Sequence, residues 1–400
     1  AGRASGGRAR LMRTQVGIVG AGPAGLVLGH LLGRRGIDSV VIEARDREYV
    51  QQRVRAGVLE QGTVDLLVEA GVGGRLEREG LVHEGLELRF GGHGHRIALS
   101  ELTEGRAITI YGQQEVVKDL IDARLEAGAP LYFEVDDVRV DAEQPRIEFS
   151  QDGSAHAIEC DVLAGCDGFH GVTRASVPEG VLTEHEHVYP FAWLGILAQV
   201  PPSTDELIYC NHQRGFALHS LRSPELSRLY LQVDPEDDIA EWPDERIWDE
   251  LQTRFALDDG SWSLNEGPIV DKAITPMRSF VVEPMQHGRL YLAGDAAHIV
   301  PPTGAKGLNL AVADVRVLAD AICDWYESGS TAQLDAYSET CLRRVWRVQH
   351  FSWWMTSMLH RVPGASNFEQ RLQRAQLDYV ARSQAGARTL AENYVGLEQV

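Results

Sequence analysis

The sequence predicts an α/β fold in which a Rossmann-like domain, split in sequence, carries an antiparallel β-sheet insert and is followed by a helical C-terminal region. Three observations predict this arrangement. A glycine pattern at 20–25 lies between an apolar run and an amphipathic stretch. From 188 to about 274 the pattern changes to alternating strands with many aromatic residues. A buried strand pattern then returns at 289–293, and helical periodicity dominates to the end of the chain. Such a change from alternating α and β elements to consecutive strands and back is typical of an inserted sheet.

The glycine pattern, GAGPAG, predicts a dinucleotide-binding turn. The apolar run at 15–19 is typical of a buried strand, and 26–32 has the pattern of the helix that follows it. In such a turn the first glycine permits the tight bend, the second lets the backbone approach a pyrophosphate, and the third lets the helix pack on the strand. The helix N-terminus offers free N–H groups to the anion. The positions expected to face the cofactor are Gly20, Gly22, Ala24 and Gly25.

A second apolar run, at 40–42, ends at Glu43, which lies 18 residues after Gly25. This spacing is close to that of an acid that binds a ribose hydroxyl. A glycine-rich turn without a ligand is the alternative interpretation. Strand, turn, helix and acid together favour a bound dinucleotide.

The later elements follow in order. Residues 86–110 alternate and contain glycines, which suggests a small β excursion, and 113–126 has a helical pattern. After the inserted sheet, the strand at 289–293 and a helix at 308–325 complete the first domain. The predicted domains are a disordered extension at 1–13, the first part of the dinucleotide-binding domain at 14–187, the β-sheet substrate domain at 188–277, the completion of the first domain at 278–325, and the helical C-terminal region at 326–400.

Composition excludes several classes of partner. The 400 residues carry a formal net charge of −20, which argues against nucleic acid and anionic membranes as ligands. No apolar run approaches the roughly 18 residues that a membrane span requires. Residues 1–13 contain four arginines but no apolar segment, so they do not resemble a secretory signal; a targeting presequence is the alternative to a disordered extension.

The five cysteines show no C-x-x-C spacing, which favours buried or idle thiols in a reducing cytoplasm. Two histidine-containing segments, 93–95 and 184–187, could bind a metal in principle. Residues two apart in polar loops are more typical of solvated surface, so no metal is predicted.

Two later motifs indicate which dinucleotide is bound. Residues 166–171 read CDGFHG after an apolar run, and 292–298 read LAGDAAH, followed by PPTGAKGLN at 301–309. Together with the glycine turn, this ordered set resembles the three-part signature of FAD-dependent aromatic hydroxylases. The resemblance implies that Asp295 holds the ribityl chain of FAD. It also implies that the 304–309 turn opens a helix whose N-terminus faces the flavin, where reduced flavin carries negative charge.

Five further segments, at 53–60, 111–113, 281–288, 351–355 and 391–397, resemble the 4-hydroxybenzoate hydroxylases of this family. The resemblance covers 14–397. It implies a homodimer, and a reaction in which NAD(P)H reduces FAD, O₂ forms a hydroperoxide at flavin carbon C4a, and one oxygen enters the ring at position 3 to give 3,4-dihydroxybenzoate. There are two alternatives. The same chemistry could act on another benzoate such as 4-aminobenzoate, or the protein could be a flavin oxidase or dehydrogenase without oxygen transfer.

A predicted hairpin, 217–222 and 228–233, carries the candidate pocket. Within a strand, residues two apart share a face, so Ser220 accompanies Arg222 and Arg228 accompanies Tyr230. A guanidinium fork binds a carboxylate through two hydrogen bonds, so an aromatic carboxylate would suit this face if it lines a pocket. From spacing alone, a solvated hairpin face is an equal alternative.

The resemblance implies roles in this pocket. Arg222, with Ser220 and Tyr230, would hold the substrate carboxylate. Tyr209 would hydrogen-bond the phenol, and Tyr394 would continue a proton relay from it.

Further positions follow from the same resemblance. The carbonyl of Pro302 would lie near the phenol, His83 would end the relay, and Arg228 would couple flavin position to reduction. The residues assigned to FAD are Gly20, Gly22, Ala24, Gly25, Glu43, Arg53, Arg55, Gln113, Asp167, Arg228, Asp295, Gly307, Leu308 and Asn309. Those assigned to the nicotinamide cofactor are Arg45, Tyr49, Arg53, His170 and Arg278. Two acids, Asp46 and Glu48, lie among the latter and would repel a 2′-phosphate, which favours NADH or dual use over strict NADPH.

Overall fold

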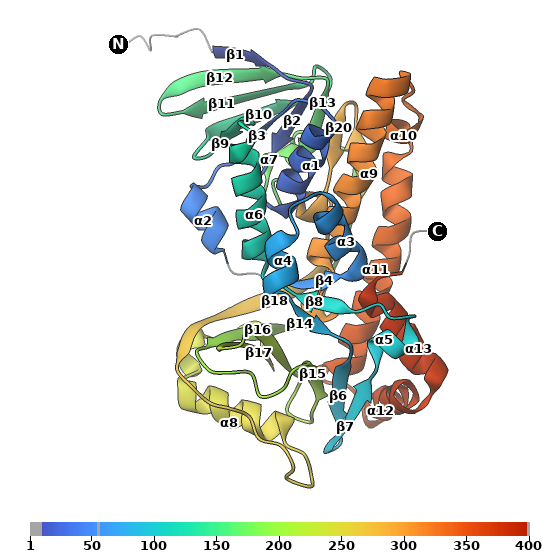
Figure 1. The fold of residues 1–400 in the computed structure, drawn as a ribbon. Helices are drawn as coiled ribbons and strands as arrows, with labels where there is room; N and C mark the ends of the chain where they lie inside the picture. Colours follow the sequence, from blue (N-terminus) through green and yellow to red (C-terminus); the bar gives the residue numbers. More distant parts are fainter. Residues whose placement is uncertain (1–9, 54–56, 398–400) are drawn as a thin grey trace.

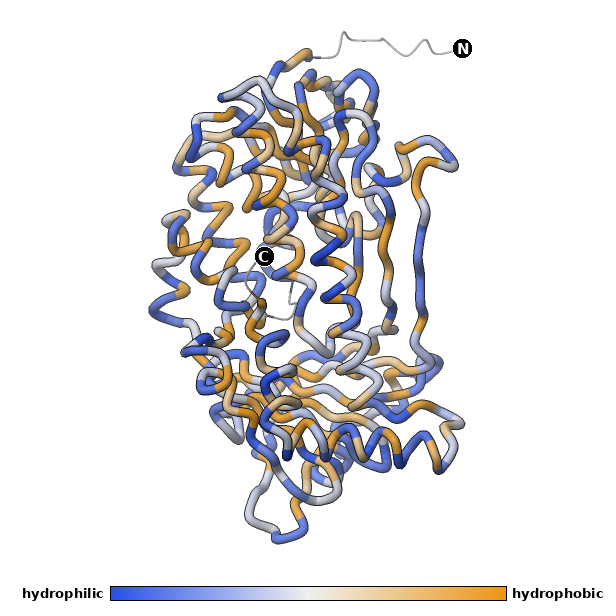
Figure 2. Tube along the Cα trace, turned by 90° about the vertical axis from the view of Figure 1, so that its right-hand side faces the viewer, coloured by the Kyte–Doolittle hydropathy of each residue, from blue (hydrophilic) through white to orange (hydrophobic). Residues whose placement is uncertain are grey.

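The computed structural model describes residues 10–53 and 57–397. It has a nucleotide-binding part built on a parallel sheet and a second part built on a larger, mostly antiparallel sheet (Figure 1). Long helices of the C-terminal region run along one side of both parts. Figure 2 shows hydrophobic segments gathered in the interior and hydrophilic turns on the outside.

The parallel sheet has the strand order β19-β20-β13-β2-β3-β9. Its four central strands pair in parallel, and β19 is an antiparallel edge strand. β20 comes from late in the chain and pairs with β13, so the sheet is completed only after the second sheet has been built. This confirms the predicted split fold. The strands are β2 (Val16–Val19), β3 (Ser39–Ile42), β9 (Leu131–Tyr132), β13 (Val162–Gly165), β19 (Gln286–His287) and β20 (Leu290–Leu292).

Helices α1 (Pro23–Arg34), α6 (Gln113–Glu126) and α9 (Gly307–Ser328) belong to this part. α1 follows β2 directly and packs against α6 and α9. The helix predicted at 113–126 has the same bounds as α6. The apolar cluster between these helices and the sheet is the larger core of the molecule, because each strand of a parallel sheet must be covered on both faces.

The second sheet has eight strands in the order β21-β18-β14-β17-β16-β15-β6-β7. Its antiparallel character agrees with the prediction except at one place, where β15 pairs in parallel with β6. β6 and β7 come from the predicted β excursion and therefore extend the sheet beyond the predicted insert. The strands are β6 (Leu86–Phe90), β7 (His93–Ile97), β14 (Thr183–Ala198), β15 (Leu207–Asn211), β16 (Ala217–Ser223), β17 (Leu226–Val233), β18 (Ile269–Glu283) and β21 (His298–Ile299). Helix α8 (Asp244–Phe255) covers one face with a separate apolar cluster.

The start of the described chain differs from the prediction of a disordered extension at 1–13. Arg10–Arg13 form strand β1, which pairs in parallel with β12 (Ser154–Glu159) at the edge of a four-stranded sheet. Backbone pairing with β12 and an ion pair between Arg13 and Asp161 hold this segment. Both partners are far away in the sequence, so the composition of residues 1–13 could not predict them. The sheet also contains β10 (Asp136–Asp141) and β11 (Arg146–Gln151). Residues 1–9 lie outside the described residues.

The C-terminal region is helical, as predicted. It contains α10 (Ala332–Asp335), α11 (Tyr337–Leu359), α12 (Asn367–Arg382) and α13 (Gln384–Val395). α12 starts with a capping box in which Ser366 and Glu369 satisfy each other's backbone N–H groups. These helices pack on the second sheet in an apolar cluster that contains the aromatic residues of the pocket described below.

The remaining elements are short. A three-stranded sheet joins β4 (Val58–Glu60), β5 (Leu81–His83) and β8 (Ile108–Ile110). The short helices are α2 (Arg47–Gln52), α3 (Gln61–Glu69), α4 (Gly74–Glu79), α5 (Leu99–Leu102), α7 (Val172–Ala175), η1 (Ile239–Glu241), η2 (Gly294–Ala296) and η3 (Pro302–Gly304). Within the described ranges, no helix combines the length and apolar character needed to cross a membrane.

Candidate active site

The glycine turn between β2 and α1 has the geometry of a phosphate cradle. Gly20 has a φ of +107°, and a Cβ there would lie 2.3 Å from the carbonyl oxygen of Cys166. A Cβ at Gly25 would lie 2.0 Å from the carbonyl oxygen of Gly20. At Gly22, by contrast, a Cβ would meet no atom within 4 Å, so open space lies in front of the helix N-terminus. Two positions are therefore glycine because of packing, and the third leaves room for a ligand.

The carboxylate of Glu43 reaches this turn. Its Oε2 accepts a hydrogen bond from the backbone N–H of Ala21 at 2.9 Å, and its Oε1 accepts one from the N–H of Arg45 at 2.9 Å. Each carboxylate oxygen can accept a second hydrogen bond. Glu43 is therefore held at the carboxyl end of β3, beside the cradle, where an acid can bind a ribose.

The Gly294–Ala296 turn presents Asp295 to solvent. Gly294 adopts a φ of +62°, and its N–H donates to Oδ2 of Asp314 at 3.0 Å. The same oxygen lies 2.6 Å from Nε2 of His298, and both of these side chains are buried. The buried Asp314–His298 pair thus fixes the turn that carries the exposed carboxylate of Asp295. A fixed, exposed carboxylate suits an acid that must hold a polyol chain.

Asp167, which the resemblance assigns to FAD, is anchored in the turn before α7. Its carboxylate accepts hydrogen bonds from the backbone N–H and the hydroxyl of Thr173, in the first turn of α7. Burial raises the pKa of Asp167, and the bonds from Thr173 oppose that rise. Among the described residues its side-chain hydrogen bonds are to Thr173, so they fix the shape of this turn.

The N-terminus of α9 is tied to the β4 strand. The side chain of Asn309 donates to the carbonyls of Val58 and Ala305, both at 3.0 Å, and accepts from the N–H of Glu60 at 2.9 Å. Ala305, before the helix, has a φ of +54°, which non-glycine residues rarely adopt. A Cβ at Gly307, the first residue of the helix, would meet no atom within 4 Å. The helix end is therefore rigid and open on one side. Leu308, beside Gly307, is half-buried.

Sequence reasoning assigned no role to Lys306 and Glu60. The Nζ of Lys306 lies 2.6 Å from Oε1 of Glu60 and donates to the carbonyl of Tyr394 at 2.9 Å. Arg344 contacts the other carboxylate oxygen at 3.2 Å. Burial lowers the pKa of Lys306, and Glu60 opposes this. The pair joins residues 246 apart in the chain, so no local pattern could have revealed it.

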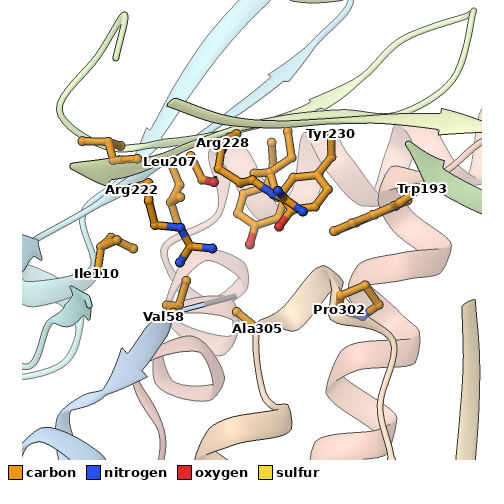
Figure 3. Close-up of a pocket in the computed structure, with 14 residues that line it drawn as sticks. Val58, Ile110, Trp193, Leu207, Arg222, Arg228, Tyr230, Pro302 and Ala305 are labelled. Atoms are coloured by element: carbon orange, nitrogen blue, oxygen red, sulfur yellow. Dashed lines mark hydrogen bonds between the residues drawn. The ribbon is translucent and has the colours of Figure 1, made fainter. Parts of the chain in front are cut away.

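A pocket of about 470 Å³, including its mouth, lies below the β15–β17 strands (Figure 3). The β16–β17 register places Ser220 opposite Arg228 and Leu218 opposite Tyr230, so the four predicted polar side chains of the hairpin share the pocket face. The alternative of a solvated hairpin face is therefore wrong. The pocket is lined by Gly57, Val58, Ile110, Trp193, Leu207, Tyr209, Leu218, Ser220, Leu221, Arg222, Arg228, Tyr230, Pro302 and Ala305.

The charge of this pocket is positive. Arg222 and Arg228 both enter it, and none of the described lining residues is an acid. Burial lowers the pKa of Arg222, and the neighbouring Arg228 adds to this. The Nε and Nη1 atoms of Arg228 are buried without a hydrogen-bond partner, and its guanidinium carbon lies 5.2 Å from the ring centroid of Tyr230. Buried donors of this kind favour an anionic ligand.

Tyr209 lines the pocket, and Tyr394, which is not a lining residue, contacts its hydroxyl. The hydroxyl of Tyr209 donates to the carbonyl of Thr303 at 3.0 Å, and it lies 2.5 Å from the hydroxyl of Tyr394. Because Tyr209 has a single proton to give, Tyr394 is then the donor between them. Burial raises the pKa of both tyrosines. Pro302 lines the pocket next to Thr303.

His83 is buried on β5, and neither ring nitrogen has a hydrogen-bond partner among the described residues. Burial lowers its pKa to about 4, so the ring is neutral. No direct hydrogen bond joins it to the tyrosine pair, and the predicted relay therefore has a gap at this end.

The residues assigned to a nicotinamide cofactor form two surface groups. At α2, the guanidinium carbons of Arg45 and Arg53 lie 5.3 and 5.8 Å from the ring centroid of Tyr49. In the other group, Arg278 lies 4.9 Å from the ring centroid of Phe169, and His170 packs against the same ring. Gln113 is the first residue of α6. Arg55 lies outside the described residues.

The chain is similar to known flavoproteins over most of its length. Residues 13–352 match the model of the FAD binding domain family. The chain is 52% identical over 389 residues to p-hydroxybenzoate hydroxylase from Acinetobacter baylyi, with 96% of each chain covered. It is 23% identical to an FAD-dependent monooxygenase from Penicillium thymicola, covering 82% of this chain and 74% of the relative. The crystal structure of p-nitrophenol 4-monooxygenase from Pseudomonas putida superposes with a TM-score of 0.82 at 19% identity, covering 98% of this chain and all of that one.

Proposed function

The chain belongs to the FAD-dependent aromatic hydroxylases, and we propose that its substrate is 4-hydroxybenzoate, hydroxylated at position 3 to 3,4-dihydroxybenzoate. The observation that carries this proposal is the pocket itself, which is lined by two arginines, by Tyr209 and Tyr230, and by apolar side chains, with the hydroxyl of Tyr394 in contact with that of Tyr209. A planar ring with a carboxylate and a para hydroxyl matches this arrangement. The name of the relative that is 52% identical supports the same choice.

We propose that Arg222 holds the carboxylate, with Ser220 and Tyr230 as neighbours. A guanidinium fork can give a carboxylate two parallel hydrogen bonds. The hydroxyl of Ser220 donates to the carbonyl of Arg228 at 2.9 Å, so it must turn from that carbonyl before it can donate to a carboxylate. Half-burial of the arginines strengthens the attraction, because the local dielectric constant is lower than that of water.

At the other end, the phenol of the substrate would compete for the hydroxyl of Tyr209. In the structure this hydroxyl donates to the carbonyl of Thr303. A phenol placed near Pro302 can give its proton to Tyr209 while Tyr209 passes its own proton to Tyr394, since the two hydroxyl oxygens are 2.5 Å apart. The exchange balances only when Tyr394 in turn releases its own proton toward solvent. The ring then carries phenolate character, which activates the neighbouring carbon toward an electrophilic oxygen.

Bound FAD would supply the redox chemistry, that is, acceptance of a hydride equivalent from NAD(P)H and activation of O₂ for transfer of one oxygen atom to the ring. The residues that fit it are the glycine cradle, Glu43, Asp295 and the open N-terminus of α9. Its placement at α9 would bring it to the pocket floor, because Pro302 and Ala305 precede that helix and line the pocket. Aromatic and aliphatic side chains around the pocket exclude water, which the oxygen-transfer step requires.

For the electron donor we propose NADH, or NADH and NADPH alike. Asp46 and Glu48 lie within the group formed by Arg45, Tyr49 and Arg53. Asp46 caps α2 by accepting from the N–H of Tyr49 at 2.7 Å, so its charge is fixed in place. A fixed negative charge here disfavours a 2′-phosphate more than the free hydroxyl of NADH. Exchanging Asp46 for Ser, which keeps the cap, should raise kcat/KM for NADPH and leave that for NADH within twofold.

We also propose a homodimer that works in the cytoplasm. Helix α12 exposes Phe368, Leu372 and Tyr379 at 71%, 55% and 59%, and their spacing places them close to one face of the helix. A contiguous apolar helix face of this kind suits a protein contact. Sedimentation of the wild-type protein beside Phe368→Ser tests this, since the variant should shift toward the monomer.

The decisive test is oxidation of NADH and NADPH by the purified enzyme with and without 4-hydroxybenzoate, combined with chromatography of products and a peroxide assay. Stimulation with stoichiometric 3,4-dihydroxybenzoate is the expected result. Stimulation that yields only peroxide would mean that another benzoate, for example 4-aminobenzoate, is the substrate. Oxidation that no benzoate affects would contradict the proposal and favour a simple oxidase or dehydrogenase.

A further inference from the structure

One wall of the pocket is an indole whose polar edge is turned away from the ligand space. Trp193 lies on β14, lines the pocket opposite Arg222, and contacts the ring of Tyr230 (Figure 3). Its Nε1–H donates to Nε2 of His360 at 2.6 Å. His360 is fully buried at the end of α11 and is not among the residues that line the pocket. This wall therefore presents only carbon atoms to the pocket.

His360 is fixed as an acceptor. Its Nδ1 lies 3.0 Å from the carbonyl of Thr356, and a carbonyl can only accept, so the proton is on Nδ1 and Nε2 carries the free electron pair. Burial lowers the pKa of His360 to about 3, which keeps the ring neutral. The ring is also stacked between Phe191 and Phe216, with centroids 4.7 and 4.2 Å away.

This arrangement has a consequence for selectivity. Product and substrate differ by one ring hydroxyl. An enzyme that forms no hydrogen bond to this added hydroxyl binds the product less tightly and releases it faster. We propose that His360 is a positioning residue that sets this selectivity by holding the N–H of Trp193 out of the pocket. The proposal rests on the proposed function, because the second hydroxyl is the one that the reaction adds.

Removing the acceptor would leave the indole N–H buried and unsatisfied, which is costly. We expect the indole then to rotate toward the pocket, where an oxygen of the ligand can accept the bond. A ligand with two adjacent hydroxyls offers more such oxygens at the ring edge than a ligand with one. The variant should therefore favour 3,4-dihydroxybenzoate.

The test uses FAD-loaded enzyme and measures the Kd of 4-hydroxybenzoate and of 3,4-dihydroxybenzoate from the change in flavin absorbance. His360→Phe keeps the aromatic stack and removes the acceptor. We expect its Kd ratio to shift toward the dihydroxy compound by about tenfold, the size of one hydrogen bond. His360→Asn retains a carbonyl acceptor and should keep the wild-type ratio.

The double variant His360→Phe/Trp193→Phe separates the N–H from packing. If the shift arises from the freed N–H, it disappears when Trp193 is Phe; a shift of the same size in both backgrounds would overturn the proposal. Trp193→Phe alone is the reference for the double variant, because it shows how the changed wall by itself affects the Kd ratio. If His360→Phe does not fold, His360→Leu, which also lacks an acceptor, is measured in the same two backgrounds. Wild-type enzyme that binds no 4-hydroxybenzoate would overturn the proposed function instead, and this inference with it.

Discussion

Burial raises the pKa of both Tyr209 and Tyr394, so both hydroxyls keep their protons at neutral pH in the structure without ligands. Neither can act as a standing base. A proton can move along the pair only if each hydroxyl accepts one proton as it gives up another. The short distance between them suits such an exchange, and the carbonyl of Thr303 holds the Tyr209 proton in the meantime.

Tyr209→Phe should therefore lower the rate of ring hydroxylation by roughly 100-fold, the lower range of what a positioned proton donor or acceptor contributes. The carboxylate anchor is unchanged, so the Kd of 4-hydroxybenzoate should rise less than tenfold. Product formation in single turnovers measures the first effect and flavin absorbance titration the second. Tyr394→Phe leaves the hydroxyl of Tyr209 in place and should have the milder effect. Full activity in Tyr209→Phe would contradict the assigned role.

Arg222→Lys tests whether the fork geometry matters as well as the charge. A lysine keeps one positive charge but loses the paired N–H groups, so the Kd of 4-hydroxybenzoate should rise by about 10- to 100-fold. The matched control is Arg388→Lys on α13, where an exposed arginine pairs with Glu392. The control should bind like wild type. Equal binding by both variants would show that the carboxylate lies elsewhere.

At the scale of elements, the β2–turn–α1 unit depends on close backbone approach. The contact between Gly25 and the carbonyl of Gly20 leaves no space for a methyl group. At Gly33, in the same helix, an added Cβ would meet no atom within 4 Å. Packing therefore requires glycine at position 25, whereas at position 33 glycine is only a weak helix former.

Gly25→Ala should thus disrupt the cradle, and the purified protein should lose most of its FAD on gel filtration. Gly33→Ala is the control, and alanine in this exposed helical position should stabilise the fold by about 0.5–1 kcal/mol. Flavin content per protein and the thermal unfolding midpoint measure both variants. A Gly25→Ala protein that keeps stoichiometric FAD would contradict this account of the turn.

Elements with a local signal were predictable from the sequence. The helix at 113–126 was found with its correct bounds, and the two-residue periodicity of the hairpin placed Ser220 and Arg222 on one face. Pairing between distant strands was not predictable. The parallel contact of β15 with β6 depends on which surfaces meet after folding, and alternation within a strand does not encode its partner.

The same limit applies to the site. Tyr209 and Tyr394 were named through a family resemblance, since residues 185 apart share no local pattern. The Lys306–Glu60 pair and the Trp193–His360 contact were missed for that reason. His83 was named, but its hydrogen-bond partners could not be foreseen, and the described residues supply none.

For the molecule as a whole, buried neutral histidines couple folding to pH. Burial lowers the pKa of His83 and His219 to about 4 and that of His360 to about 3. In the unfolded chain each would titrate near 6.5. Below that pH the unfolded state binds more protons than the folded state, so stability falls as pH decreases and is fully present only above about 6.5.

We expect the free energy of unfolding to fall between pH 6.5 and 4.5 by roughly 4 kcal/mol per pH unit at most, about 1.4 for each of the three histidines. Urea unfolding at several pH values measures this slope. His219→Gln keeps an acceptor for the N–H of Ser203, which contacts Nε2 of His219 at 3.1 Å, and should lower the slope by about one proton. A slope that the variant does not change would contradict the assignment.

All five cysteines are buried and free of disulfides. Burial raises the pKa of Cys160 and Cys210 to about 12, and maleimides react with the thiolate, so the native thiols should resist labelling while the fold is intact. A single cysteine introduced on the surface, for instance at an exposed position of α12, would then carry a fluorophore selectively without prior removal of native thiols. Two such positions, one on each large sheet, would allow the distance between the nucleotide-binding and substrate-binding parts to be followed by energy transfer during turnover.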